Sequence, residues 1–305
     1  MRIVSAGEGL VDLVATGSGT YLPVAGGSPL NVATGLRRLG VAAAWLGRRS
    51  TGAFGDVLGR HLASEGIDTA FVQMTGAPTS LAVVDFDGGQ PRYDFYLEGT
   101  TNTGWDGPTP PLAPEDVLHV GFGAVRAHEG ALGVVLAALV EREHGQRVIT
   151  LDPNVRPVAG QRTGALREAI ERLVKRSDLV KVSVEDLRAL DIDDVEGTAA
   201  GWARHALVVL TFGAGGAVAF AREGVRVAIA ARPVEVVDAV GAGDATMAGL
   251  LAWLADHHAL DPERIRALSA AELHAMVDLG VRCASVSCMR TGADPPTRTS
   301  LAEFP

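Results

Sequence analysis

Cysteine, aromatic residues and excess positive charge are scarce in this 305-residue chain. Only Cys283 and Cys288 occur, and their spacing fits neither a metal-binding CxxC pair nor a disulfide framework, so we expect a reducing, cytoplasmic location. A net charge of −9 and 5 % aromatic residues argue against a nucleic-acid partner, which usually meets a basic stripe and stacking rings. No apolar run reaches the roughly 18 residues of a membrane span, so no membrane partner is expected. No secretion signal is expected either, because Gly7, Glu8, Gly9 and Asp12 interrupt the apolar residues near the start.

The remaining composition is that of an ordinary globular protein, with 47 % hydrophobic and 21 % charged residues. At about 100–200 residues per domain, the length leaves room for one large domain or for one domain plus a small appendage, and we predict a single domain over residues 1–305. Short apolar runs alternate with stretches of helical spacing, which predicts an α/β fold whose parallel strands are buried on both faces. The expected strands are 2–7, 42–47, 117–122, 147–151, 178–182 and 206–211. The expected helices are 29–39, 54–65, 130–143, 163–176, 196–204, 243–257 and 270–285.

Residues 79–97 interrupt this alternation. Two runs of alternating polarity flank the turn-forming cluster Asp87-Gly88-Gly89 and predict a hairpin without a crossover helix. An extended segment over about 10–24 is expected to join the hairpin in a small second sheet outside the main layer. We interpret this small sheet as a lid over a ligand site, and an edge hairpin without a role is the alternative.

The segment 233–257 carries the most informative signal. A strand is expected to end at Asp238, followed by a glycine-rich turn and a strongly helical run. Gly241, Ala242 and Gly243 would leave the first N–H groups of that helix free and accessible to an anion such as a phosphate. The segment therefore predicts an anion-binding helix N-terminus.

Asp244, at the rim of this turn, is a candidate general base. A carboxylate beside a phosphate site would repel its ligand unless it had a compensating task, and accepting a hydroxyl proton is such a task. The helix N-terminus is expected to lower the pKa of Asp244, which phosphoryl transfer tolerates because it depends mainly on positioning and charge neutralisation. Helix capping is the alternative role. The sequence GAGD fits neither a Walker loop nor a dinucleotide-binding loop, which disfavours a dehydrogenase.

Two separate motifs extend this interpretation: DAVGAGDATMAGLL near the C-terminus and GGSPLNVATGLRRLG at 26–40. Both resemble the signatures of the ribokinase (PfkB) family of carbohydrate kinases, in the family's order. The resemblance is closest to fructokinases and 2-keto-3-deoxygluconate kinases. It implies a ribokinase-like three-layer α/β/α fold with a mostly parallel central sheet and a small β-sheet lid. Further similar segments cover essentially the whole chain, namely GEGLVDLV, LDPNVRP, LVKVSVEDL, TFGAGGA and SCMRTGADPPT.

The resemblance implies a sugar pocket. Asp12, Gly27 and Asn31 match family positions that hydrogen-bond sugar hydroxyls, and Ser28 lies beside them. From the residues alone, Asp12 could instead be a turn residue and Asn31 a polar residue early in a helix.

Two further parts of the sugar site are implied. Arg156 could clamp a hydroxyl or the carboxylate of a sugar acid, with solvation at the surface as the alternative. Phe95 and Tyr96 in the hairpin resemble aromatic positions that cover a keto-sugar, and ordinary hairpin packing is their alternative.

The same resemblance implies an ATP site on the other side of the turn. A solvated strand-end lysine is the alternative for Lys181. The implied nucleotide-binding residues are Lys181, Ser183, Thr211, Gly213, Gly216 and Gly243.

Two cation sites are also implied. The family organises Mg²⁺ with an Asn-x-x-Glu motif, which is here replaced by the run from Ser183 to Asp186. Asp186 or Glu185 is therefore the implied carboxylate near Mg²⁺, and Ser183 can still bond a metal-bound water. Asp238 and backbone carbonyls within 287–294 resemble a monovalent-cation site, which implies K⁺, whereas capping of a turn is the alternative for Asp238.

The implied function is an ATP-dependent sugar kinase that transfers the γ-phosphate to a hydroxyl of a small carbohydrate, with fructose as the expected substrate. A kinase for 2-keto-3-deoxygluconate or a nucleoside remains an alternative, as does a non-catalytic sugar-binding regulator of the same fold. Arg156 keeps a sugar acid open, whereas Asp12 favours a neutral sugar. A homodimer formed through the lid is expected, as in some relatives.

Overall fold

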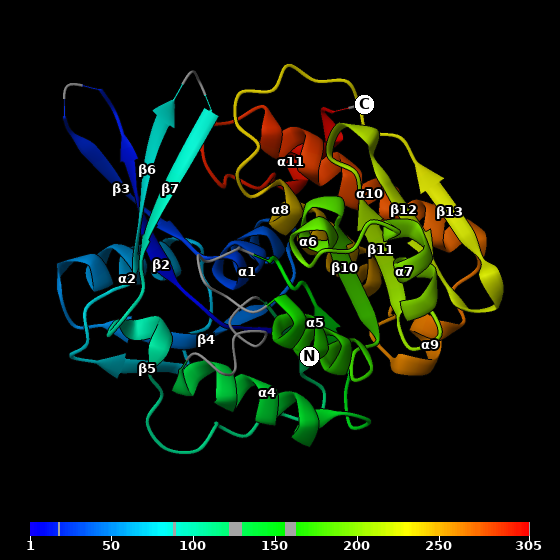
Figure 1. The fold of residues 1–305 in the computed structure, drawn as a ribbon, viewed down its shortest axis with the longest axis horizontal. Helices are drawn as coiled ribbons and strands as arrows, with labels where there is room; N and C mark the ends of the chain where they lie inside the picture. Colours follow the sequence, from blue (N-terminus) through cyan, green and yellow to red (C-terminus); the bar gives the residue numbers. More distant parts are fainter. Residues whose placement is uncertain (18, 88–89, 122–129, 156–162, 305) are drawn as a thin grey trace.

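A mostly parallel sheet of nine strands forms the middle layer of the protein in the part of the chain that the structure describes (Figure 1). The computed structural model describes residues 1–17, 19–87, 90–121, 130–155 and 163–304. Along the sheet, the order is β13-β12-β11-β10-β9-β8-β1-β4-β5, with parallel pairing except at β12 and β13. These strands are β1 (Ile3–Ala6), β4 (Ala43–Ser50), β5 (Val72–Thr75), β8 (Val117–Val120), β9 (Ile149–Leu151), β10 (Leu179–Ser183), β11 (Leu207–Thr211), β12 (Ala217–Phe220) and β13 (Arg226–Ile229).

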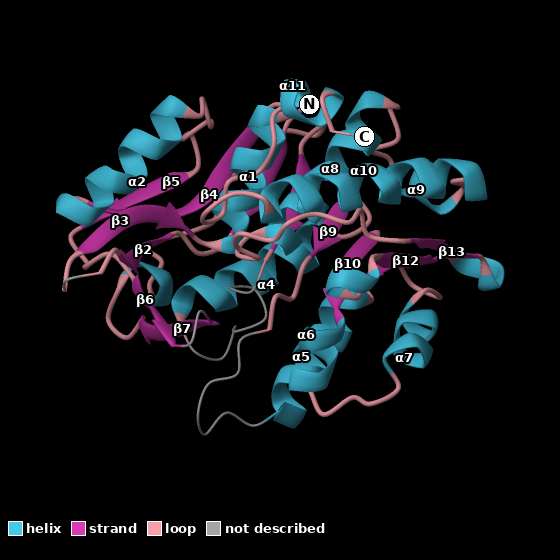
Figure 2. Ribbon diagram, turned by 90° about the horizontal axis from the view of Figure 1, so that it is seen from above, coloured by secondary structure: helices cyan, strands magenta, loops and turns pink. Residues whose placement is uncertain are grey.

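Helices cover both faces of this sheet. Figure 2 shows α1, α8 and α10 on one side and α4, α5, α6 and α7 on the other, which confirms the predicted three-layer α/β/α architecture. The described helices are α1 (Ser28–Arg38), α2 (Ala53–Ser64), α4 (Ala131–Glu143), α5 (Thr163–Val174), α6 (Val184–Ala189), α7 (Val195–Trp202), α8 (Ala242–Asp256), α9 (Pro262–Arg266), α10 (Ala270–Cys288) and α11 (Arg298–Ala302).

The strands are apolar on both faces because each face meets a separate core. Ile3 and its neighbour Val4 are both fully buried, yet Ile3 belongs to the core with α1, α8 and α10, and Val4 to the core with α4 and α5. Continuous apolar runs are what a parallel sheet between two helical layers requires. The six strands and seven helices predicted by residue range are confirmed, with their ends shifted by a few residues. Phe122, the last residue of the strand predicted over 117–122, lies outside the described residues.

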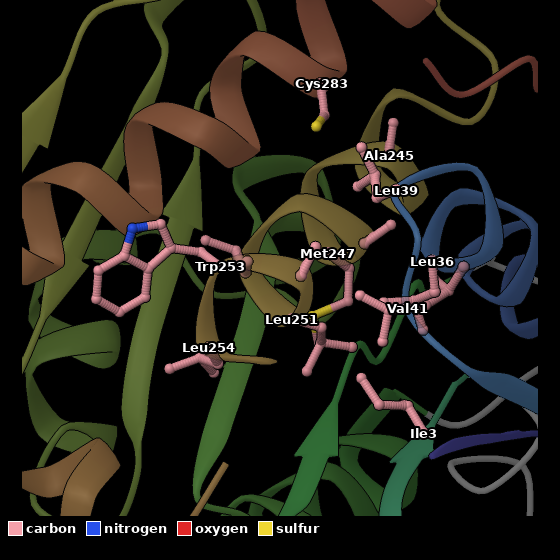
Figure 3. Packing of buried hydrophobic residues seen from close by; sticks show 14 of the residues in the cluster. Ile3, Leu36, Leu39, Val41, Ala245, Met247, Leu251, Trp253, Leu254 and Cys283 are labelled. Atoms are coloured by element: carbon pink, nitrogen blue, oxygen red, sulfur yellow. The ribbon is translucent and has the colours of Figure 1, made fainter. Parts of the chain in front are cut away.

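Helix α8 lies at the centre of one helical layer. It is apolar on nearly all sides, and every residue from Asp244 to Leu254 is buried, as expected of a helix that is surrounded by protein. Figure 3 shows Met247 and Leu251 of α8 facing Leu36 of α1 across this core. The packing sets the beginning of α8 next to the beginning of α1.

The strand predicted to end at Asp238 is wrong, because the residues between β13 and α8 form no strand. The N–H groups of Val237 and Asp238 donate to the C=O of Cys288 at the end of α10, at 2.8 and 3.1 Å. Val236 and Val237 are exposed. A β-branched run becomes a strand only where a neighbouring strand pairs with it, and β13 already forms this edge of the sheet.

A second sheet, the lid sheet, stands at one end of the central sheet (Figure 1, blue and cyan). The predicted segments 10–24 and 79–97 form it together, except that Ser18 and the hairpin residues Gly88 and Gly89 lie outside the described residues. Its strand order is β3-β2-β6-β7. The strands are β2 (Leu10–Ala15), β3 (Tyr21–Gly26), β6 (Leu81–Asp87) and β7 (Gln90–Tyr96).

The register of the lid sheet decides which side chains share a face. Asp12 is opposite Ala82, and Ala82 is opposite Phe95, so Asp12 and Phe95 lie on the same face. Tyr96, the next residue of β7, lies on the other face. The aromatic pair of the sequence is therefore split between the two faces.

Among the residues that the structure describes, no helix is both long enough and apolar enough to cross a membrane.

Candidate active site

The turn before α8 has the geometry of an anion-binding site. Gly241 adopts a left-handed conformation with φ of 75° and directly precedes the helix. The N–H groups of Gly243 and Asp244 donate to no acceptor among the described residues, as is usual in the first turn of a helix. The N–H of Ala242 donates to the C=O of Ala239 at 3.3 Å. Two unpaired amides and the positive end of the helix dipole thus lie at the predicted position.

The carboxylate of Asp244 is held by two side chains from the first turn of α1. Ser28 Oγ donates to Asp244 Oδ1 at 2.7 Å, and Asn31 Nδ2 donates to Asp244 Oδ2 at 2.9 Å. Asp244 is 7 % exposed, whereas Asn31 and Gly243 are half-buried. The family resemblance implies that Ser28 and Asn31 bind the sugar, and in the structure both side chains hold the candidate base.

The pKa of Asp244 is raised to about 6, so the predicted lowering is wrong. Burial is the largest cause, and the negative charge of Asp152 adds to it. The hydrogen bonds from Asn31 and Ser28 and the charge of Lys181 act in the opposite direction. Loss of hydration therefore outweighs the helix N-terminus, and Asp244 is a stronger base at neutral pH than its sequence context predicts.

A pH profile tests this basicity. Because Asp244 must be ionised to accept a proton, kcat/KM is expected to fall below about pH 6, approaching a tenfold decrease per pH unit. Replacing Asn31 with alanine removes a hydrogen bond to the charged form, so this acid limb should move to higher pH. The measurement is kcat/KM of both proteins between about pH 5 and pH 8. An acid limb that is the same in both proteins would contradict the assigned hydrogen bond.

Asp12 of the lid sheet approaches the same place. Burial raises the pKa of Asp12 to about 7, and the charge of Asp244 adds to this effect. Gly26 on the neighbouring strand β3 leaves the space that the Asp12 carboxylate occupies, because a Cβ there would collide with it. Gly27, with φ of 110°, directly precedes α1, and a Cβ on it would lie 2.6 Å from the carbonyl oxygen of Glu8. Asp12 of β2 and the α1 residues Ser28 and Asn31 thus converge on Asp244.

Lys181 is buried beneath the turn, so the solvated alternative is wrong. Its side chain is 5 % exposed, and its Nζ donates to Asp152 Oδ2 at 2.9 Å. A Cβ built on Gly243 would lie 2.7 Å from Lys181 Nζ, so the ammonium lies directly against this glycine. Sequence reasoning missed Asp152. Its position at the carboxyl end of the strand β9, where ligands of parallel sheets bind, is the signal that could have indicated it.

The carboxylate of Asp186 caps α6. It accepts hydrogen bonds from the N–H and Oγ of Ser183 at 2.8 and 2.7 Å, and from the N–H of Val155 at 2.6 Å. Asp186 is buried, and Glu185 is exposed. No group of three or more His, Cys, Asp or Glu side chains among the described residues could hold a metal ion. The run from Ser183 to Asp186 replaces the family's metal-binding motif. Through the hydrogen bond from Val155 to Asp186, it links α6 to the segment after β9.

The predicted nucleotide residues on β10 and β11 lie side by side. Ser183 is opposite Thr211 in the parallel pairing of these strands. Gly213 follows, with φ of 55°, in a short 3-10 turn. Gly216 has φ of 93°, and a Cβ there would collide with the C=O of Ile229. Ser183 and Thr211 therefore lie at the carboxyl ends of the neighbouring strands β10 and β11, and Lys181 lies on β10 two residues before Ser183.

Asp238 connects the turn to the segment after α10. Its Oδ1 accepts from the N–H of Val240 and its Oδ2 from the N–H of Gly292, both at 2.9 Å. The next residue, Ala293, lies against Gly241, where a Cβ would come within 2.7 Å of the Ala293 Cβ. Asp238 therefore caps a turn and braces the anion-binding site. The predicted Arg156 lies outside the described residues.

Comparison with known proteins defines the class. The sequence pattern of the pfkB family carbohydrate kinases matches residues 3–300, and the chain belongs to this family. It is a fructokinase-like phosphotransferase within the family. The chain is 34 % identical to the fructokinase of Rhizobium leguminosarum bv. trifolii, over 87 % of this chain and 83 % of that protein. It is 35 % identical to the fructokinase of Klebsiella pneumoniae, over 88 % of each chain.

Solved structures agree with this assignment. The fructokinase of Vibrio cholerae O395 with fructose, ADP and calcium bound has a TM-score of 0.85 and 25 % identity, covering 99 % of this chain and 98 % of that one. A double mutant of the same enzyme with fructose, ADP and potassium bound has a TM-score of 0.86 and 25 % identity, covering 99 % and 97 %. The ribokinase-like fold and the lid sheet of the present chain are therefore confirmed.

Proposed function

We propose that this protein phosphorylates a hydroxyl of fructose with ATP. The observation that carries the proposal is the position of Asp244, directly behind the glycine turn and held by Ser28 and Asn31 of α1. From this position the carboxylate can accept a proton from a sugar bound on the side of α1 and the lid sheet, while a phosphate binds at the turn. Fructose and ADP bound to the similar Vibrio cholerae enzyme support the choice of substrates.

In the proposed reaction, Asp244 takes the proton of the sugar hydroxyl while the hydroxyl oxygen bonds to the γ-phosphorus of ATP. The bond between this phosphorus and the bridging oxygen breaks, and its electron pair leaves with ADP. The N–H groups of Gly243 and Asp244, with Gly241 and Ala242 shaping the turn, bind the oxygens on which charge develops. Closure of the lid sheet would exclude water and so prevent hydrolysis of ATP.

The donor set suits a Mg²⁺ ion that arrives with the nucleotide and keeps most of its water. Asp186 already accepts three hydrogen bonds, and Glu185 is exposed, so both would act through metal-bound water. When bound, Mg²⁺ would neutralise charge on the phosphates. For K⁺, we propose the carbonyls near Asp238, as the potassium in the similar double mutant suggests.

A neutral sugar fits the charges around Asp244 better than a sugar acid. Asp12 and Asp244 both face the proposed sugar position, and the negative charge of Asp244, together with that of Asp12 when it is ionised, would repel the carboxylate of 2-keto-3-deoxygluconate. The release of ADP with fructose, glucose, 2-keto-3-deoxygluconate and a nucleoside tests the proposal. If the acid or the nucleoside is turned over faster than fructose, that compound and not fructose is the substrate. An absence of ADP release with all of them would favour a binding protein.

The lid provides a second test. Phe95 shares the face of Asp12, so truncation of Phe95 to alanine should raise the KM for fructose about tenfold by removing apolar contact. Tyr96 has a similar size but lies on the other face, which makes Tyr96→Ala the matched variant with little effect on KM. Steady-state kinetics at saturating ATP measure both. A larger effect at Tyr96 would mean that the opposite face covers the sugar.

We further propose that residues 1–305 act as one kinase domain in the cytoplasm and that two copies associate through the lid. Exposed apolar side chains on the lid sheet, among them Leu22 and Tyr96, support this association. The two cysteines are unpaired, as a reducing compartment favours. Sedimentation of the wild type and of a Leu22→Ser variant measures the association.

A further inference from the structure

A buried ion pair lies beneath the glycine turn, and nothing described so far requires both of its members. Asp152 is completely buried and Lys181 is 4 % exposed. Removing two charges from water is unfavourable, and apolar residues of similar size often stabilise a fold equally well. The stability of the core therefore does not explain this pair.

The choice of lysine is informative in this chain. Lys175 and Lys181 are its only lysines, and all the remaining Lys or Arg residues of the chain are arginines. Lys175 is exposed on the surface, so Lys181 is the only buried lysine. An ammonium is a compact charge with three donors, and it fits against the bare Cα of Gly243, where a planar guanidinium would need more room. Asp152 accepts from only one of these donors.

The surroundings keep Lys181 charged. Burial alone would lower the pKa of Lys181, but the nearby charges of Asp152, Asp186 and Asp244 raise it above its ordinary value. His119, fully buried on β8, stays neutral because burial, reinforced by the charge of Lys181, lowers its pKa to about 3. A fixed positive charge is thus maintained between two carboxylates with different tasks.

We propose that Asp152 and Lys181 form a charge pair that serves phosphoryl transfer: Asp152 holds the ammonium against Gly243, and Lys181 donates hydrogen bonds to the transferred phosphoryl group. This inference rests on the proposed kinase function. Lys181 is then a catalytic residue that balances charge on the phosphoryl oxygens and keeps its own proton throughout. Asp152 is a positioning residue that prevents Lys181 from pairing with Asp244 and so keeps the base available.

The pair has an electrostatic signature at Asp244. The charged groups facing Asp244 are Asp12 from β2, Asp152 directly after β9 and Lys181 from β10, and Asp186 from α6 faces Lys181. The charge of Asp152 raises the pKa of Asp244, and the charge of Lys181 lowers it. Loss of one member should therefore shift the acid limb of the pH profile in the opposite direction to loss of the other.

The test compares the wild type with Lys181→Met, Asp152→Asn, the double variant, and Lys175→Met as the matched control for loss of a lysine. Turnover of Lys181→Met should fall at least about a hundredfold with the KM for fructose nearly unchanged, as for loss of an oxyanion donor. Its acid limb in kcat/KM should move to higher pH, and that of Asp152→Asn to lower pH. Lys175→Met should behave as the wild type.

Wild-type turnover in the folded Lys181→Met variant would overturn the assignment, because a lysine that serves only the fold affects stability and the pH profile but not the rate at saturating substrate. Shifts of the acid limb in the same direction in the two single variants would show that the pair does not act on Asp244 as two opposite charges. If a single variant does not fold, the double variant decides, since it leaves no unpaired buried charge. Turnover of the folded double variant near that of the wild type would refute the proposal, and turnover reduced as in Lys181→Met would support it. The proposed function fails separately, if the wild type releases no ADP with any sugar.

Discussion

Replacing Asp244 with asparagine is expected to lower turnover at least about a hundredfold, the usual range for loss of a general base. Asparagine has nearly the same shape but cannot take the proton of the sugar hydroxyl. Binding of ATP should be largely retained, because the donors at the turn are the backbone N–H groups of Gly243 and residue 244. Turnover and the dissociation constant of ATP are the two measurements.

Asp56→Asn is the matched control for this variant. Asp56 also lies in the first turn of a helix, α2, but its side chain is exposed and α2 carries no candidate site residue. The Asp56→Asn substitution makes the same chemical change at an equivalent helix position, so its turnover should stay at the wild-type value. Wild-type turnover in Asp244→Asn as well would reject Asp244 as the base and leave it a helix-capping residue.

Gly241→Ala is expected to reduce both stability and turnover. A left-handed φ of 75° is unfavourable by about 1–2 kcal/mol for a residue with a Cβ. The new Cβ would also lie 2.7 Å from the Cβ and 2.8 Å from the Cα of Ala293. Backbone cannot move away easily here, because Asp238 holds both Val240 and Gly292. The turn should therefore shift, misplacing its amides and lowering turnover at least about tenfold.

Gly145→Ala separates the two causes. Gly145 has φ of 76°, nearly the same as Gly241, but an added Cβ there meets nothing within 4 Å. The Gly145→Ala variant should lose thermal stability because of its left-handed backbone conformation, and it should keep full turnover. Equal losses of turnover and of melting temperature in both variants would show that contact with Ala293 does not position the site.

Asp244 shows how a local rule can be overruled. The first turn of a helix favours a charged carboxylate, which predicts a lowered pKa. Burial against α1 and the charge of Asp152 act more strongly, and the pKa rises to about 6. Neither Ser28 nor Asp152 is near Asp244 in sequence, so no reading of the motif alone could weigh these contributions.

Strand formation before α8 and side-chain direction in the lid sheet also depend on tertiary structure. Val236 and Val237 have the residue type of a strand but find no pairing partner, because the sheet already ends at β13. Phe95 and Tyr96 are adjacent in sequence, yet the pairing of β7 with β6 sends them to opposite faces. Pairing partners are a tertiary property in both cases.

The amino-acid order alone was sufficient for the alternating strands and helices, the lid hairpin and the glycine turn with its acid, because apolar periodicity and helix-start chemistry act over a few neighbouring residues. Only the tertiary structure decided the basicity of Asp244, the burial of Lys181 and the use of Asp186 as a cap. These depend on lost hydration and on charges that act through space, and chain folding alone brings α1, β9, β10 and α8 to one place.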